Sequence, residues 1–94
     1  MIKGSCLATK KVFKKNHIGY AYRESPSPTN PVDTGWRFFY GDEDEAYCSK
    51  ASNIGLYDIQ SILNIDESVI WFLDAPEGTR IVLSEDGKWS RETD

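Results

Sequence analysis

Residues 35–45 read Gly-Trp-Arg-Phe-Phe-Tyr-Gly-Asp-Glu-Asp-Glu, and this stretch decides how the rest of the chain is interpreted. In its first half, large aromatic side chains alternate with Arg37 and Phe39, which is the two-residue period of a strand half buried in a sheet. Gly41 then lets the backbone turn out of that strand. Four consecutive carboxylates follow, and because like charges repel, they must lie in water or meet a cationic partner. The stretch predicts a core strand that delivers a negative loop to the surface; its alternating aromatic residues are Trp36, Phe38 and Tyr40.

The size and composition of the chain predict one domain over residues 1–94. The sequence has 94 residues, of which 39% are hydrophobic and 13% aromatic, enough for a single core and too apolar for a disordered chain. Each large ring removes roughly 150–250 Å² from water when it is buried. A few aromatic side chains are therefore expected to supply much of the core.

The charges are unevenly placed along the chain. The net charge is −4, yet residues 1–23 contain six Lys or Arg residues and no acidic residue. A calculated pI near 4.9 argues against nonspecific binding to nucleic acid by the whole molecule, so we expect no nucleic-acid partner. The lysines are interpreted as a solvated edge, with a basic patch for an acidic partner as the alternative.

The sequence shows neither a targeting segment nor a cysteine pattern typical of disulfide-bonded proteins. No apolar run approaches the roughly 20 residues that span a bilayer, and no apolar segment follows the N-terminal lysine as it would in a signal peptide. These observations predict a cytoplasmic protein with no membrane partner. Cys6 and Cys48 are expected to be small buried hydrophobic residues rather than a disulfide.

A second strand is predicted in residues 18–23. There Tyr20 and Tyr22 alternate with small residues, which gives one bulky face and one small face. We expect this strand to pair antiparallel with the aromatic strand, so that the two tyrosines lie beside Trp36 and Phe38.

The other segments complete an α+β pattern. A charged bend is expected at residues 10–16, anchored by Val12 and Phe13, and three prolines within residues 25–31 force a surface loop. Apolar periodicity predicts the remaining elements: strands at 5–9, 79–84 and 88–91, a helical turn in 46–50, a loop at 51–55, and helices at 56–64 and 67–74. The predicted fold class is α+β, with a mostly antiparallel sheet of about four to five strands and two short helices packed on one face.

No motif for catalysis or metal binding stands out. His17 is the only histidine and no Cys-x-x-Cys pair exists, whereas a zinc site needs about four ligands. The acidic run does not match the calcium-binding loop template, and no glycine-rich phosphate loop precedes a helix. His17 could act as a base for Ser25 or Cys48, and nothing in the pattern selects either pair. We therefore expect no metal, no cofactor and no enzymatic activity.

Aromatic residues on neighbouring strands leave a further alternative open. Sheet-surface aromatics stack bases in RNA-binding modules. The other interpretation is that these side chains form the core face, and we favour it because a small domain needs buried area. The residues concerned are Tyr20, Tyr22, Phe38 and Tyr40.

Five quoted segments together resemble a known family. They are Ile-Gly-Tyr-Ala-Tyr-Arg-Glu at 18–24, Asp-Thr-Gly-Trp-Arg-Phe-Phe-Tyr-Gly-Asp-Glu-Asp at 33–44, Asn-Ile-Gly-Leu-Tyr-Asp at 53–58, Leu-Asn-Ile-Asp at 63–66 and Leu-Asp-Ala-Pro-Glu-Gly-Thr at 73–79. This succession resembles a small bacterial domain family of unknown function that was later classed among the immunity proteins of polymorphic toxin systems, as the thirty-third type. The resemblance implies a cytoplasmic, non-enzymatic protein that binds a cognate toxin and blocks it. No catalytic residues come with it.

The leading functional hypothesis is therefore a protein-binding immunity protein with a protein partner, such as a basic toxin domain. Its negative contact surface is predicted at Asp42, Glu43, Asp44 and Glu45, where carboxylates can speed association by electrostatic steering. Tyr47 and Tyr57 are candidate aromatic anchors, with a core role equally open. The alternatives are a general regulatory or ligand-binding domain that uses the proline loop and the helix pair, and, third, an enzyme.

Overall fold

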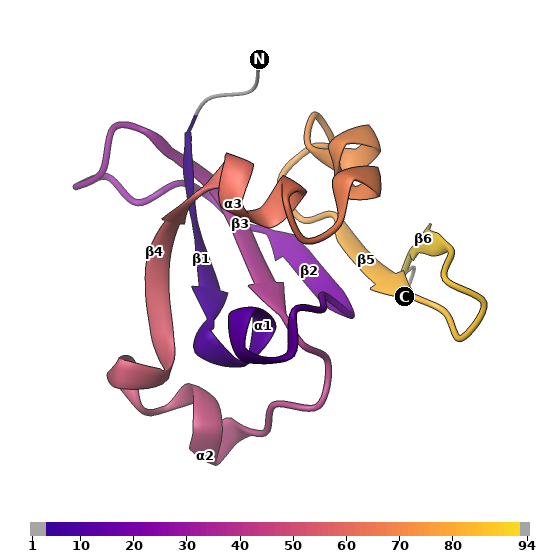
Figure 1. Cartoon of the computed structure of the whole chain (residues 1–94). Helices are drawn as coiled ribbons and strands as arrows, with labels where there is room; N and C mark the ends of the chain where they lie inside the picture. The colour runs from indigo at the N-terminus through magenta and orange to yellow at the C-terminus, as the bar shows by residue number, and fades with distance from the viewer. Residues whose placement is uncertain (1–3, 93–94) are drawn as a thin grey trace.

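The computed structural model describes residues 4–92, and within them the chain forms a six-stranded sheet in the order β4-β1-β3-β2-β5-β6 (Figure 1). All neighbouring pairs are antiparallel except β1 and β3, which run parallel. This arrangement confirms the predicted α+β class and the mostly antiparallel sheet. The strands are β1 Ser5–Thr9, β2 Tyr20–Arg23, β3 Asp33–Phe39, β4 Ile54–Asp58, β5 Arg80–Leu83 and β6 Trp89–Arg91.

Short helices connect the strands. They are α1 Lys10–Lys15, α2 Glu45–Cys48, α3 Ile59–Leu63 and the 3₁₀ helices η1 Ala51–Asn53 and η2 Glu67–Phe72. The predicted charged bend at 10–16 is instead the helix α1, which ends where Asn16 adopts the left-handed conformation at φ 52°. Val12 is fully buried, as the anchoring prediction requires. None of the helices among the described residues is long and apolar enough to cross a membrane.

Strand β4, which the sequence analysis did not predict, is the main departure from the expected fold. A loop at 51–55 and a helix from residue 56 were expected, but residues 54–58 pair with all five residues of β1 and the helix begins only at Ile59. Ile62 is buried, as expected for the apolar side of the predicted helix, whereas Leu56 lies on the strand and is 61% exposed. The pairing with β1 overrides the helical spacing because it satisfies the backbone of both strands.

The core lies between the sheet and one layer of helices. Side chains from α1, α3 and η2 join inward residues of the strands in one buried cluster, which includes Trp36 and Phe38. The Trp36 indole Nε1–H donates to the Leu73 carbonyl at 3.1 Å, and the Arg23 guanidinium donates to the Leu73 and Ala75 carbonyls. These bonds attach the chain after η2 to the sheet.

The register of β2 on β3 contradicts the predicted placement of the tyrosines. Tyr20 lies opposite Phe39 and Tyr22 lies opposite Arg37, while the small residue Ala21 faces Phe38. The tyrosines therefore share the outward face of β3, not the face of Trp36 and Phe38. A register difference of one residue moves every side chain to the other face of a sheet.

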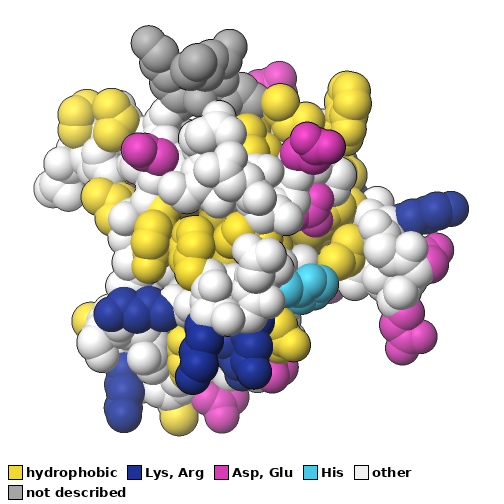
Figure 2. Space-filling model, in the orientation of Figure 1, with side chains coloured by type: hydrophobic (Ala, Val, Ile, Leu, Met, Phe, Trp, Pro, Cys, Tyr) yellow, Lys and Arg dark blue, Asp and Glu magenta, His cyan; other side chains and the backbone are white. Residues whose placement is uncertain are grey.

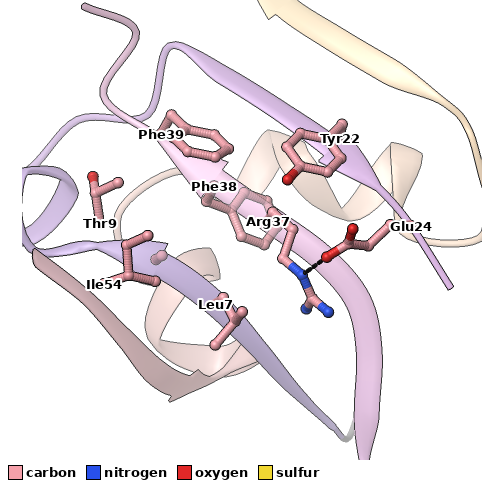
Figure 3. Close-up of a pocket in the computed structure, with 9 residues that line it drawn as sticks. Leu7, Thr9, Tyr22, Glu24, Arg37, Phe38, Phe39 and Ile54 are labelled. Carbon is pink, nitrogen blue, oxygen red and sulfur yellow. Dashed lines mark hydrogen bonds and ion pairs between the residues drawn. The ribbon is translucent and has the colours of Figure 1, made fainter. Parts of the chain in front are cut away.

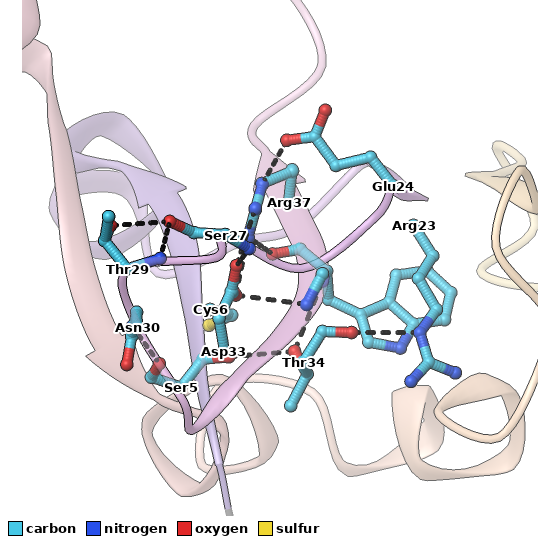
Figure 4. A network of polar contacts seen from close by, with 12 residues as sticks. Ser5, Cys6, Arg23, Glu24, Ser27, Thr29, Asn30, Asp33, Thr34 and Arg37 are labelled. Atoms are coloured by element: carbon cyan, nitrogen blue, oxygen red, sulfur yellow. Dashed lines mark hydrogen bonds and ion pairs between the residues drawn. The ribbon is translucent and has the colours of Figure 1, made fainter.

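A buried ion pair fixes the proline loop to β3 (Figure 4). Arg37 donates to both carboxylate oxygens of Asp33 at 2.9 Å and to Glu24 Oε2 at 2.6 Å, and Asp33 also accepts the backbone N–H of Ser27 and Gly35. The guanidinium of Arg37, followed by the two backbone N–H groups, overcomes the cost of burial and holds the pKa of Asp33 well below its usual range. The network ties the residues before and after the proline loop to one another.

Candidate interaction surface

The acidic loop, residues 42–45, follows β3 and lies beside α1 and α2 at the bottom of the view in Figure 1. Three of its four carboxylates belong to exposed residues, Asp42, Asp44 and Glu45. Asp42 pairs with Lys11 at 2.6 Å, and Asp44 caps α2 by accepting the backbone N–H of Tyr47 at 2.8 Å. Glu45 opens α2, where the helix dipole favours a negative charge.

Glu43 is the exception, because its side chain turns inward. It accepts hydrogen bonds from Thr9 Oγ1 at 2.5 Å and from the backbone N–H groups of Tyr40 and Gly41, both at 2.7 Å. Burial opposes the negative charge, but the hydroxyl and the two backbone donors hold the pKa of Glu43 below its usual value. This carboxylate closes the loop onto the end of β1 and so fixes the direction of its neighbours.

The charge around the acidic loop is mixed. Lys10, Lys14 and Lys15 are exposed on α1, and with Lys11 they border a hollow of about 410 Å³ that also touches Tyr47 and Asn53. Figure 2 shows dark-blue side chains gathered in the lower part of this face with magenta ones beside them. The loop is therefore one half of a surface that carries both signs of charge.

The two candidate tyrosines lie in different places. Tyr47 sits in α2 directly after the loop and is half buried beside the lysine-bordered hollow. Tyr57 lies on the helix-bearing side of β4, opposite Cys6, with its ring centroid 4.2 Å from that of Phe13. The structure thus brings Tyr47 to the loop and packs Tyr57 against the core.

The opposite side of the sheet carries an aromatic surface, whereas the favoured sequence interpretation placed Tyr20 and Tyr22 on the core face. We call this surface the open face; its side chains share the register of Tyr20 and Phe39, and they are Leu7, Tyr20, Tyr22, Arg37, Phe39, Leu56, Arg80 and Val82. Its apolar members are half buried or, for Leu56, exposed. The alternation in residues 18–23 and 35–40 indicated that each strand has two different faces. Which of these faces points away from the core depended on the register between β2 and β3.

Three rings on the open face form a fixed platform. Tyr22 stacks on Phe39 at 5.7 Å between centroids with an interplanar angle of 15°, and Tyr20 lies 5.8 Å from Phe39. Figure 3 shows Tyr22 and Phe39 side by side above Arg37, with Leu7 and Ile54 across the hollow. Burial raises the pKa of both tyrosines, so their hydroxyls remain neutral donors near neutral pH.

Two hollows flank Phe39. The first, of about 80 Å³, lies among Leu7, Tyr22, Arg37 and Ile54. The second, of about 160 Å³, joins the open face to the acidic loop; its lining residues are Tyr20, Phe39, Gly41, Glu43 and Cys48. The open face and the acidic loop are therefore parts of one continuous surface.

Both arginines of the open face meet carboxylates. Arg37 is held by Asp33 and Glu24, and Arg80 lies 3.8 Å from Glu92. Neither guanidinium faces the solvent as an isolated charge.

A separate apolar feature lies on η2, on the right of Figure 1 and away from α2. Trp71 is 83% exposed and its neighbour Ile70 is 44% exposed. They border a hollow of about 550 Å³ whose other lining residues are mostly polar, among them Gln60 and Glu67.

The described part of the chain contains no cluster of side chains suited to bind a metal ion. Residues 4–92 contain no group of three or more His, Cys, Asp or Glu side chains placed to hold an ion. Cys6 is buried and Cys48 half buried, and both thiols are free. Burial raises the pKa of Cys6 to about 12, which leaves it an unreactive thiol.

Comparison with known proteins places the chain in a family. The model of the Immunity protein Imm33 domain matches residues 6–93, nearly the whole sequence. No curated protein and no solved structure matches the chain. The match covers the sheet, the acidic loop and the open face alike, and the chain therefore belongs to the Imm33 immunity-protein family.

Proposed function

We propose that this protein binds a cognate bacterial toxin and neutralises it by occupying the toxin's functional surface, without catalysis of its own, in the cytoplasm. The observation that carries the proposal is the family match over residues 6–93, since family membership suggests a toxin-neutralising role. A binding protein of this kind needs a rigid surface rather than reactive groups.

The acidic loop is proposed as one part of the contact. Asp42, Asp44 and Glu45 are exposed, and Glu43 holds the loop against Thr9 and the backbone after β3. Such preorganisation lowers the entropy lost on binding. Toxins that act on nucleic acid carry basic clefts for phosphate, and an ordered carboxylate cluster complements such a cleft.

The neighbouring lysines limit the expected strength of this effect. Because Lys11 already offsets Asp42, the loop presents a mixed-charge pattern more than a strong negative field. We therefore expect it to contribute selectivity and association rate more than affinity.

The test uses candidate toxin domains taken from the genes that neighbour the gene of this protein. Co-expression should protect cells from one of these toxins, and the two purified proteins should form a complex. The double substitution Asp42→Asn with Asp44→Asn should slow association several-fold at low salt, with a melting temperature close to wild type, because asparagine also caps helices. Glu67→Gln with Asp74→Asn serves as the control, since it removes two exposed charges elsewhere.

The outcomes separate the two claims. Absence of both protection and complex formation would overturn the proposed function. Complex formation with an unchanged association rate for the double variant would leave the function standing and remove the acidic loop from the contact.

A further inference from the structure

We infer that the open face is the apolar centre of the toxin-binding site, with Phe39 and its two flanking hollows receiving apolar side chains from a basic surface of the toxin. This inference rests on the proposed function, and it assigns the partner's chemistry and the residues that grip it.

The first argument is the unusual exposure of large apolar side chains. In a domain this small, aromatic residues are needed for the core, yet Tyr20, Tyr22 and Phe39 are only half buried while Ala21 takes the core position between the tyrosines. Leu56 extends the same face with 61% of its surface exposed. Contiguous apolar patches on a soluble protein mark interaction sites.

The second argument is rigidity. The three rings contact one another at centroid distances of 5.7 and 5.8 Å, and they stand on paired strands rather than on a loop. Aromatic side chains fixed in this way provide large contact area at a small cost in conformational entropy. This is the composition and setting of residues that dominate binding energy in protein interfaces.

The third argument is the charge at the border of the face. The second hollow runs from Tyr20 and Phe39 to Glu43, so the open face adjoins the acidic loop at that residue. The Glu43 carboxylate is held there by Thr9 and two backbone N–H groups, and the exposed carboxylates of the loop follow on either side of it in the chain. The arginines of the face are already engaged, Arg37 by Asp33 and Glu24 and Arg80 by Glu92. An apolar centre with a carboxylate rim complements a partner whose apolar side chains are surrounded by lysine or arginine.

The same charges argue against single-stranded nucleic acid on this platform. Base stacking on sheet aromatics is accompanied by cationic contacts to phosphate. On the open face the two guanidinium groups meet carboxylates instead, and the adjoining loop is acidic. A protein partner is therefore favoured over RNA.

The exposed Trp71 is the competing anchor. It stands on η2 beside polar residues and does not join the acidic loop through a shared hollow. The open face combines several apolar residues with the rim, so it is the stronger site, and Trp71 becomes a control.

The experiment measures binding of the same toxin domain to four folded variants. Phe39→Thr and Leu56→Lys alter the open face; threonine is well tolerated in strands, and Leu56 is exposed, so that at least the second variant should fold. Val32→Lys is the matched control, because Val32 is also 61% exposed but precedes β3, at the end away from the acidic loop. Trp71→Ser tests the competing site.

We expect Phe39→Thr and Leu56→Lys each to raise Kd roughly tenfold to a hundredfold. Val32→Lys and Trp71→Ser should stay within about twofold of wild type, with circular dichroism confirming the fold of every variant. In a parallel titration, fluorescently labelled polyuridine should show no change in anisotropy with the wild type at physiological salt.

Each contrary result has its own meaning. If the wild type does not bind the toxin domain, the proposed function fails and this inference fails with it. If the wild type binds but Leu56→Lys binds equally well, or Trp71→Ser alone loses binding, the function stands and the open face is not the site. Saturable polyuridine binding that Phe39→Thr abolishes would replace the protein partner with RNA.

Discussion

Replacing Glu43 with glutamine should separate the one structural carboxylate of the acidic loop from its three exposed neighbours. In the native protein, Oε1 accepts the Gly41 N–H, while Oε2 accepts both the Tyr40 N–H and the Thr9 hydroxyl. The glutamine amide retains only one acceptor oxygen, so its NH₂ group must face at least one of these donors.

The magnitude follows from the number of bonds and their exposure. Three hydrogen bonds with net contributions of about 1 kcal/mol each set a scale of about 3 kcal/mol. Because Glu43 is only half buried, water can satisfy part of the loss, and we expect the free energy of unfolding to fall by about 2 kcal/mol. For a domain of this length, that is a decrease of roughly 10 °C in melting temperature.

Thermal unfolding followed by circular dichroism at pH 7 measures the effect, with Glu45→Gln as the matched control. Glu45 makes no side-chain hydrogen bond among those of the described residues, so its substitution should change stability by less than about 0.5 kcal/mol. A double-mutant cycle of Glu43→Gln with Thr9→Val isolates the hydroxyl contribution.

The pH dependence gives an independent check. The pKa of Glu43 is lower in the folded protein than in the unfolded chain, so its ionised form stabilises the fold fully above the unfolded value of about 4.3. That contribution is lost as the pH falls through the folded pKa. The stability difference between wild type and Glu43→Gln should therefore shrink below about pH 4. A melting temperature within 2 °C of wild type at pH 7, or a difference independent of pH, would refute a structural role for this carboxylate.

Three further substitutions test the fold and its surface by thermal or urea unfolding. Asp33→Ala should cost roughly 3–5 kcal/mol because it leaves the buried Arg37 guanidinium without its main partner, and a loss below 1 kcal/mol would mean that Glu24 alone suffices. Gly35→Ala should cost more than about 2 kcal/mol, since φ is +86° and a Cβ there would lie 2.1 Å from the Glu24 carbonyl oxygen; a stable variant would contradict that geometry. Trp71→Ser should change stability by no more than about 0.5 kcal/mol, and a larger loss would show that the indole packs on the core.

Local sequence patterns were sufficient where they depended on neighbouring residues alone. Alternation in residues 35–40, the glycine that follows and the unbroken carboxylates predicted β3 and the exposed loop, and the prolines in 25–31 predicted the loop before it. A helical turn was predicted at residues 46–50, and the structure has α2 one residue earlier, at Glu45–Cys48, because the Asp44 side chain caps it. These features involve contacts a few residues apart, which residue type and spacing determine.

Only the tertiary structure decided which face of the sheet is buried. The sequence showed two faces on β2, but pairing Tyr20 with Phe39 rather than with Phe38 sends both tyrosines outward, and that register depends on contacts with β3 and β5. The inward turn of Glu43 likewise requires Thr9, 34 residues away in the chain. Side-chain periodicity in the sequence determines that each strand has two different sides. The helices α1, α3 and η2 pack on one side of the sheet, and this packing decides which side becomes core and which remains available to a partner.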